Sequence, residues 1–219
     1  MGQQQQKQLI VSNYNLEYDL EKFLRTEFSS HFTLKITLQH LSSGDSFIFD
    51  LSKSIVQCNN LQELTLNLND CFVSIKGTTY LSQILPKLQN LITLKIDLDW
   101  NHIDSIAVQD LSSVFSNCTK LQNLSFNASN NLITDQGAYE LAFNLLNCKN
   151  VRNLSLQLNN NYITEQGAYQ FALILAKCGN VQNLCLQLNG IGIQLSNRLK
   201  LTMRLLKAKR LVQLYTSFN

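Results

Sequence analysis

One leucine recurs every 30 residues along most of this chain of 219 residues. No insertion or deletion interrupts the spacing, and apolar residues follow two and four positions after nearly every one of these leucines. Alternation of this kind predicts a short strand with one buried face in each repeat. The recurring leucines are Leu34, Leu64, Leu94, Leu124, Leu154, Leu184 and Leu214.

The second half of each repeat carries a pair of apolar residues four positions apart, which is typical of one face of a helix. These pairs are Leu51 and Ile55, Leu81 and Leu85, Leu111 and Phe115, Leu141 and Leu145, Phe171 and Leu175, and Leu201 and Leu205. Because a helix returns the chain to the same end of the sheet, successive strands must run parallel. Strands stack about 4.8 Å apart and helices about 10 Å apart, so the array has to curve. The predicted fold is an α/β solenoid, a curved right-handed β-α horseshoe with about seven parallel strands on the concave side and helices on the convex side.

Two segments carry a family resemblance: residues 131–138, NLITDQGA, and residues 161–168, NYITEQGA. They resemble the ribonuclease-inhibitor class of leucine-rich repeats, which includes the GTPase-activating proteins of the Ran system. The chain's many Asn and Gln residues also resemble proteins of ciliated protozoa. The resemblance implies an inward-turned side chain that bonds loop backbone at Cys71, Asn101, Asn131 and Asn161. Ile191 departs from this pattern, so its loop is expected to differ.

The ends of the chain fall outside the repeat pattern. We expect a flexible tail over residues 1–14, although residues 9–11 have the option of docking. A helical stripe predicts a capping helix over residues 15–30, ahead of a repeat array over residues 31–219. The seventh strand has no capping helix after it, and a bare strand edge is a template for pairing with another chain. Three interpretations stay open: a tolerated short edge strand, a sequence that stops before the array does, or a docking surface for a partner.

The residues argue against chemistry of the chain's own. The three histidines lie in different repeats, and no phosphate-binding glycine loop occurs. We therefore predict no enzyme activity, cofactor, metal site or small-molecule substrate. The six cysteines include no CxxC pair, and the N-terminus lacks the apolar core of a signal peptide. Reduced thiols and a cytoplasmic location, with the cytoskeleton or cilium as one context, are expected.

Four cysteines occupy one repeated position and are expected to be buried: Cys58, Cys118, Cys148 and Cys178. Cys185 instead faces the concave side and is the best candidate for an accessible thiol. No apolar run is long enough for a membrane span. The net charge of +3 is too small to indicate nucleic-acid binding.

The outward strand positions predict the character of the concave face. Charges fall in the first three repeats, whereas later repeats carry amides and hydroxyls such as Asn123, Ser125, Asn153 and Ser155. Two interpretations of this face are open. The chain's bias toward Asn and Gln has simply filled solvent-exposed positions, or the face is a polar surface that docks another protein. Trp100, the only tryptophan, lies on the rim, where it is either an interface anchor or a loop residue. The protein-binding candidates on this side are Lys35, Lys95, Asp97, Asp99, Trp100, Gln157, Cys185, Gln187 and Tyr215.

Basic residues gather in the last predicted helix and the loop that follows it. They are Arg198, Lys200, Arg204, Lys207, Lys209 and Arg210. Such residues stabilise a helix C-terminus as a solvated face. Alternatively they form a patch for an acidic partner or RNA, with Arg198, Arg204 and Lys207 as candidates.

A rigid curved surface without reactive groups favours one function. We predict a non-enzymatic protein-protein interaction scaffold or a structural subunit of a larger assembly, with cytoskeletal or ciliary structures as one setting. Other proteins are the expected partners, docked at the concave face or at the C-terminal edge. The alternatives are a regulator of a small GTPase, suggested by the resemblance to the Ran-system activators, and a weak binder of RNA or an acidic partner.

Overall fold

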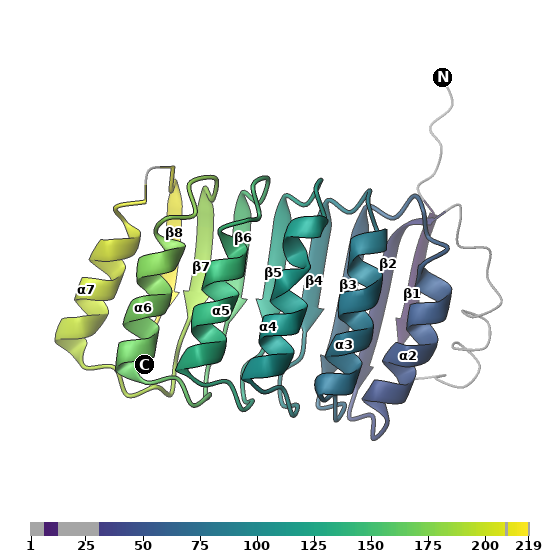
Figure 1. The fold of residues 1–219 in the computed structure, drawn as a ribbon, viewed down its shortest axis with the longest axis horizontal. Helices are drawn as coiled ribbons and strands as arrows, with labels where there is room; N and C mark the ends of the chain where they lie inside the picture. Colours follow the sequence, from purple (N-terminus) through teal and green to yellow (C-terminus); the bar gives the residue numbers. More distant parts are fainter. Residues whose placement is uncertain (1–6, 13–30, 209, 219) are drawn as a thin grey trace.

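The computed structural model describes residues 7–12, 31–208 and 210–218 as one parallel sheet covered by helices on one face (Figure 1). The strands, in spatial order, are β1 (Lys7–Ser12), β2 (His31–Gln39), β3 (Glu63–Asn69), β4 (Thr93–Asp97), β5 (Asn123–Asn127), β6 (Asn153–Gln157), β7 (Asn183–Gln187) and β8 (Gln213–Ser217). The helices are α2 (Gly44–Ile55), α3 (Ile75–Ile84), α4 (Ser105–Ser113), α5 (Asp135–Leu145), α6 (Glu165–Leu175) and α7 (Leu195–Leu205). The 3-10 turns η3 (Leu85–Lys87) and η4 (Phe115–Asn117) follow α3 and α4. The predicted α/β array is confirmed.

The strands pair in a register that repeats the sequence period. Leu34 lies opposite Leu64, Leu64 opposite Leu94, and so on to Leu214. Residues at one repeat position therefore form straight rows across the sheet. The inward rows pack against the helices in one continuous apolar core. The outward rows form the face that no helix covers, which we call the open face (Figure 1).

Within the predicted flexible tail, residues 1–14, the structure follows the docking option that the sequence left open for residues 9–11. Lys7–Ser12 forms β1, which pairs with β2 and places Ile10 opposite Lys35. The edge of β2 offers unpaired backbone groups, and the apolar, largely β-branched segment at residues 9–11 suits a strand. The predicted capping helix at residues 15–30 lies outside the described residues.

The loops after the strands are held by buried side-chain amides, as the resemblance implied. The Asn101 Oδ1 atom accepts from the backbone N–H groups of Cys71 at 3.1 Å and Val73 at 2.7 Å. Its Nδ2 atom donates to the Leu68 carbonyl at 2.8 Å. Asn131 and Asn161 make the counterparts of the Val73 and Leu68 bonds one and two repeats later. Each amide thus ties the loop of its own repeat to the preceding repeat.

The loop around Ile191, which was expected to differ, lacks this amide but keeps the backbone turn of the earlier repeats. Glycines stand on both sides of it, with φ of +76° at Gly190 and +71° at Gly192. The Gly190 position has positive φ in earlier repeats too, including Asn130 and Asn160, so the backbone turn is shared. The last loop keeps the turn and loses the side-chain tie.

Candidate functional site: a groove on the open face

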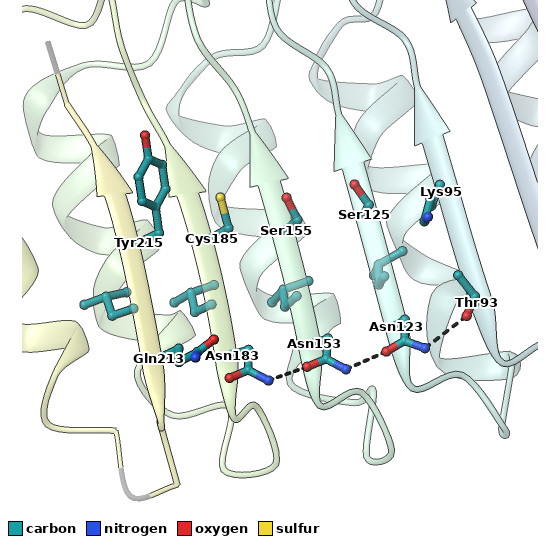
Figure 2. Close-up of a pocket in the computed structure, with 14 residues that line it drawn as sticks. Thr93, Lys95, Asn123, Ser125, Asn153, Ser155, Asn183, Cys185, Gln213 and Tyr215 are labelled. Atoms are coloured by element: carbon teal, nitrogen blue, oxygen red, sulfur yellow. Dashed lines mark hydrogen bonds between the residues drawn. The ribbon is translucent and has the colours of Figure 1, made fainter.

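A groove of about 630 Å³ crosses the open face from β4 to β8 (Figure 2). Among the described residues that line it, Lys95 is the only charged one. We call it the open-face groove. Its lining residues are Thr93, Lys95, Asn123, Leu124, Ser125, Asn153, Leu154, Ser155, Asn183, Leu184, Cys185, Gln213, Leu214 and Tyr215.

The hollow follows from the sizes of the side chains in one row. Ser125, Ser155 and Cys185 occupy the same position on three successive strands, between Lys95 on β4 and Tyr215 on β8. Three small side chains bounded by two long ones leave an elongated depression (Figure 2). The depression is therefore as long as five neighbouring strands are wide, about 19 Å at 4.8 Å per strand step.

A ladder of amides forms one side of the groove. Asn183 Nδ2 donates to Asn153 Oδ1, and Asn153 Nδ2 donates to Asn123 Oδ1, both at 2.5 Å. Asn123 Nδ2 donates to Thr93 Oγ1 at 3.0 Å (Figure 2). Because these side chains hold one another in line, the row is ordered before any ligand arrives.

Acidic groups lie at the N-terminal side of the groove. Asp97 follows Lys95 on β4, and Asn127 Nδ2 donates to its Oδ1 atom at 3.0 Å. Burial raises the pKa of Asp97, while the bonds from the Asp99 backbone and from Asn127 lower it. Lys95 Nζ lies 4.0 Å from Glu63 Oε1, so its charge is partly balanced. The rest of the groove offers neutral donors and acceptors.

The structure distributes the predicted binding residues over several places. Lys95, Cys185 and Tyr215 line the open-face groove. Gln157 and Gln187 lie in the adjoining row with Asp97. The twelve candidates do not form one site.

The other candidates lie farther from the groove lining. Asp99 and Trp100 stand in the loop after β4, where Trp100 is 63% exposed. Lys35 is on β2, two strands from Lys95. Arg198 and Arg204 are on α7 and Lys207 follows it, so these three belong to the helix layer.

Sequence reasoning placed Asn123, Asn153 and Asn183 on this face but did not rank them as binding residues. Their signal was a recurrence of Asn directly before the repeated leucine in three successive units. A recurrence of this kind predicts a row of stacked amides once the register is known. The hollow depends on side-chain size along the neighbouring row, which the period of the repeat does not encode.

The four repeated cysteines are buried beneath the surface, as predicted. Burial raises the pKa of Cys58 and Cys148 to about 12 and that of Cys118 and Cys178 to about 11. In the described part of the chain, no three His, Cys, Asp or Glu side chains are grouped so that they could hold a metal ion. Cys185 is half-buried in the groove and is the one described thiol that is not fully buried.

None of the described helices is both long and apolar enough to cross a membrane.

Comparison with known proteins gives matches in structure only. No family model matches the chain. No curated protein sequence matches either, so these comparisons do not support a ciliate repeat family. The C-terminal domain of tropomodulin from Caenorhabditis elegans superposes with a TM-score of 0.52 and 10% identity, over 73% of this chain and 93% of that chain. The actin-binding site 2 of leiomodin-1 superposes with a TM-score of 0.56 and 15% identity, over 74% of this chain and 89% of that chain. At these identities the likeness concerns the fold, and this chain is similar in architecture to leucine-rich-repeat domains of the tropomodulin and leiomodin type.

Proposed function

We propose that this chain is a non-enzymatic protein-binding scaffold that acts as a structural subunit of a cytoskeletal assembly. The observation that carries the proposal is the open-face groove, a preformed and nearly uncharged hollow spanning five strands. The likeness to the actin-binding site 2 of leiomodin-1 makes actin the first partner to test.

The chemistry of the groove suits an extended, uncharged segment of a partner protein. Carboxamide side chains carry the same donor and acceptor groups as a peptide backbone. The ladder of Asn123, Asn153 and Asn183 uses one N–H group of each amide within the ladder, which leaves the second free for a ligand. A strand rises about 3.3 Å per residue, so a groove about 19 Å long holds about six extended residues.

The direct test is co-sedimentation of the full chain with actin filaments, using a variant that fills the groove. Ser155→Trp places an indole in the middle of the hollow, and Gln170→Trp places one on the exposed helix layer as the matched control. We expect the unmodified chain and Gln170→Trp to pellet with filaments and Ser155→Trp to lose at least about tenfold in affinity, or about 1.4 kcal/mol. Equal binding by both variants would show that the groove is not the surface that binds actin filaments.

Cross-linking of the native assembly extends the test to partners other than actin. Lys35 and Lys95 report on the open face, whereas Lys149 and Lys177 report on the ends of α5 and α6. Cross-links to one protein from Lys95 but not from Lys149 or Lys177 would support docking at the groove. If Lys95 gives no cross-link to any partner while helix-layer lysines do, the open face is not the binding surface.

A further inference from the structure

Helix α7 lies at one end of the array (Figure 1). Its exposed surface carries an apolar stripe. The helix buries Leu201 and Leu205 in the core, whereas four other apolar side chains are mostly exposed. These are Leu195, Leu199, Met203 and Leu206, with exposed fractions of 72%, 63%, 60% and 55%. Their spacings of four, four and three residues place them along one side of the helix. The stripe is about 16 Å long at 1.5 Å per residue.

Interior repeats show what normally occupies the start of this side. The first residue of α5, Asp135, accepts from the backbone N–H of Thr164 in the next repeat at 2.6 Å. Glu165, the first residue of α6, accepts from the backbone N–H of Gln194 at 2.9 Å. The equivalent residue of α7 is Leu195, which offers no acceptor. This end is therefore chemically unlike the polar joints between most interior repeats.

One interior helix also starts with an apolar residue, and it clarifies the difference. Ile75 opens α3, and the next helix, α4, is capped by its own Asp104, which accepts from the Ala107 N–H at 2.8 Å. An apolar residue at this position is therefore compatible with a neighbouring helix that satisfies its own N-terminus. A helix that packs beside α7 would likewise have to satisfy its own N-terminal N–H groups.

The charge on α7 and in the segment after it is of one sign. After Glu165 the sequence contains seven Lys or Arg residues and no Asp or Glu. Arg204, Lys207 and Arg210 are exposed, and none of them forms a salt bridge with another described residue. An exposed apolar stripe on an end of the array that also carries exposed, unpaired basic residues is complementary to an acidic amphipathic surface.

We propose that the surface formed by this stripe, by the exposed Val212 and by the basic residues Arg204, Lys207 and Arg210 docks an acidic amphipathic helix of a partner protein. We call this surface the α7 face. A helix of about three turns matches the length of the stripe, with its apolar side on the leucines and its acidic residues toward the basic residues at and after the C-terminal end of α7. The α7 face lies in the helix layer, so it binds independently of the open-face groove.

A partner protein fits this end of the array better than an anionic membrane surface does. In the described chain, β8 pairs with β7 on one side only, and its outer backbone groups lie at the same end as α7 (Figure 1). Backbone N–H and C=O groups need hydrogen-bond partners, which the apolar region of a bilayer does not provide. A protein supplies such partners beside the apolar contact.

The test uses the full chain and a fluorescent synthetic peptide of about 14 residues, with leucines on one helical side and glutamates on the flanks. A peptide of the same composition in scrambled order is the control ligand. We expect anisotropy to show binding of the amphipathic peptide alone, and weaker binding as salt rises from about 0.05 to about 0.2 M, because salt screens the attraction to the basic residues. Equal binding of the scrambled peptide would overturn the proposal.

Variants place the interaction on α7. Leu199→Asp is expected to weaken peptide binding at least about tenfold. Tyr139→Asp, at the equivalent exposed position of α5, is expected to bind as the unmodified chain does. The pair Arg204→Glu and Lys207→Glu is expected to weaken binding and to remove most of its salt dependence. Thermal melts of each variant check folding, and a similar loss in Tyr139→Asp would contradict the assignment to α7.

Two further measurements separate the alternatives. Binding to vesicles of anionic phospholipid without binding to the peptide would make the α7 face a membrane surface and overturn the proposal. Ser155→Trp is expected to leave peptide binding unchanged, so the failure of the groove and the failure of the α7 face are distinguishable.

Discussion

The interior repeats and the last repeat share one backbone and differ in how they join their neighbours. In the interior, Asn131 bonds the loop of the preceding repeat, and Asp135 accepts from Thr164, the residue that caps the helix of the following one. In the last repeat Ile191 and Leu195 stand at these two positions. The strand, the turn and the helix are retained, whereas the polar joints are replaced by apolar side chains. The side-chain contacts between units, rather than the backbone of each unit, therefore depend on what lies next to the unit.

The largest expected loss of stability comes from replacing the buried loop amide, Asn131. Asn131→Leu leaves the Ile103 N–H and the Leu98 carbonyl without the bonds of 2.9 Å and 2.8 Å that they make to this side chain. Unpaired buried groups cost about 1–3 kcal/mol each, so the free energy of unfolding is expected to fall by about 4 kcal/mol. Urea denaturation measures this fall. Asn147→Ala, at an exposed position, is the control, and a similar small loss in both variants would show that the joint is not the source of stability.

The next effect concerns the close approach of successive helices. A Cβ atom at Gly167 would overlap the carboxylate of Asp135, so Gly167→Ala must displace the cap on the neighbouring turn. We expect a loss of about 2 kcal/mol, as for other overpacked sites. Gly179→Ala, where an added Cβ meets nothing closer than 4.0 Å, is expected to be almost neutral. Equal denaturation midpoints for the two variants would contradict the close contact.

A smaller loss of stability is expected from removing the contact between successive helices at Asp135. Asp135→Ala removes acceptors for the Thr164 backbone N–H at 2.6 Å and hydroxyl at 2.7 Å, for an expected loss of about 1 kcal/mol. Leu195→Ala truncates the equivalent residue of α7, which is 72% exposed, and is expected to change stability by less than about 0.5 kcal/mol. Thermal denaturation of both variants makes the comparison. A larger loss for Leu195→Ala would mean that Leu195 is already covered within the chain.

The smallest effect does not involve stability and concerns the relative reactivity of two thiols, Cys148 and Cys185. Burial raises the pKa of Cys148 to about 12, and the thiolate is the form that reacts with alkylating reagents. At pH 8 a thiol of that pKa is ionised to only about one part in 10⁴, so Cys185 is expected to react with iodoacetamide long before Cys148. Mass spectrometry of partly labelled folded protein reports the order. Early labelling of Cys148 would show that the repeat opens at this position.

Much of this architecture could be predicted because the 30-residue spacing fixes the register. Once Leu34 and Leu214 belong to one row, every outward row follows, and so do the buried positions of Cys58 and Cys148. The inward turn of Asn131 was implied by the resemblance to known leucine-rich repeats. These features depend on periodicity, which a sequence displays directly.

Other features depend on contacts that periodicity does not encode. The strand Lys7–Ser12 lies outside the repeat phase and pairs through its backbone, so no spacing announced it. The open-face groove depends on the relative sizes of Ser125, Ser155 and Tyr215 across separate strands. The role of Asp135 as a cap for Thr164 requires the distance between two helices. Each of these is a relation between units rather than a property of one unit.

The amide ladder on the open face also has a direction. Asn183 donates to Asn153, Asn153 to Asn123, and Asn123 to Thr93, so all three N–H groups point toward β4. Asn160 and Asn130 donate in the same sense along the rim, ending at the Asp99 carboxylate. Aligned amide dipoles add, which gives the two ends of the groove opposite polarity. A peptide bound along the groove would therefore meet a surface that distinguishes its N-terminus from its C-terminus. The groove would select one orientation of the peptide independently of the peptide's sequence.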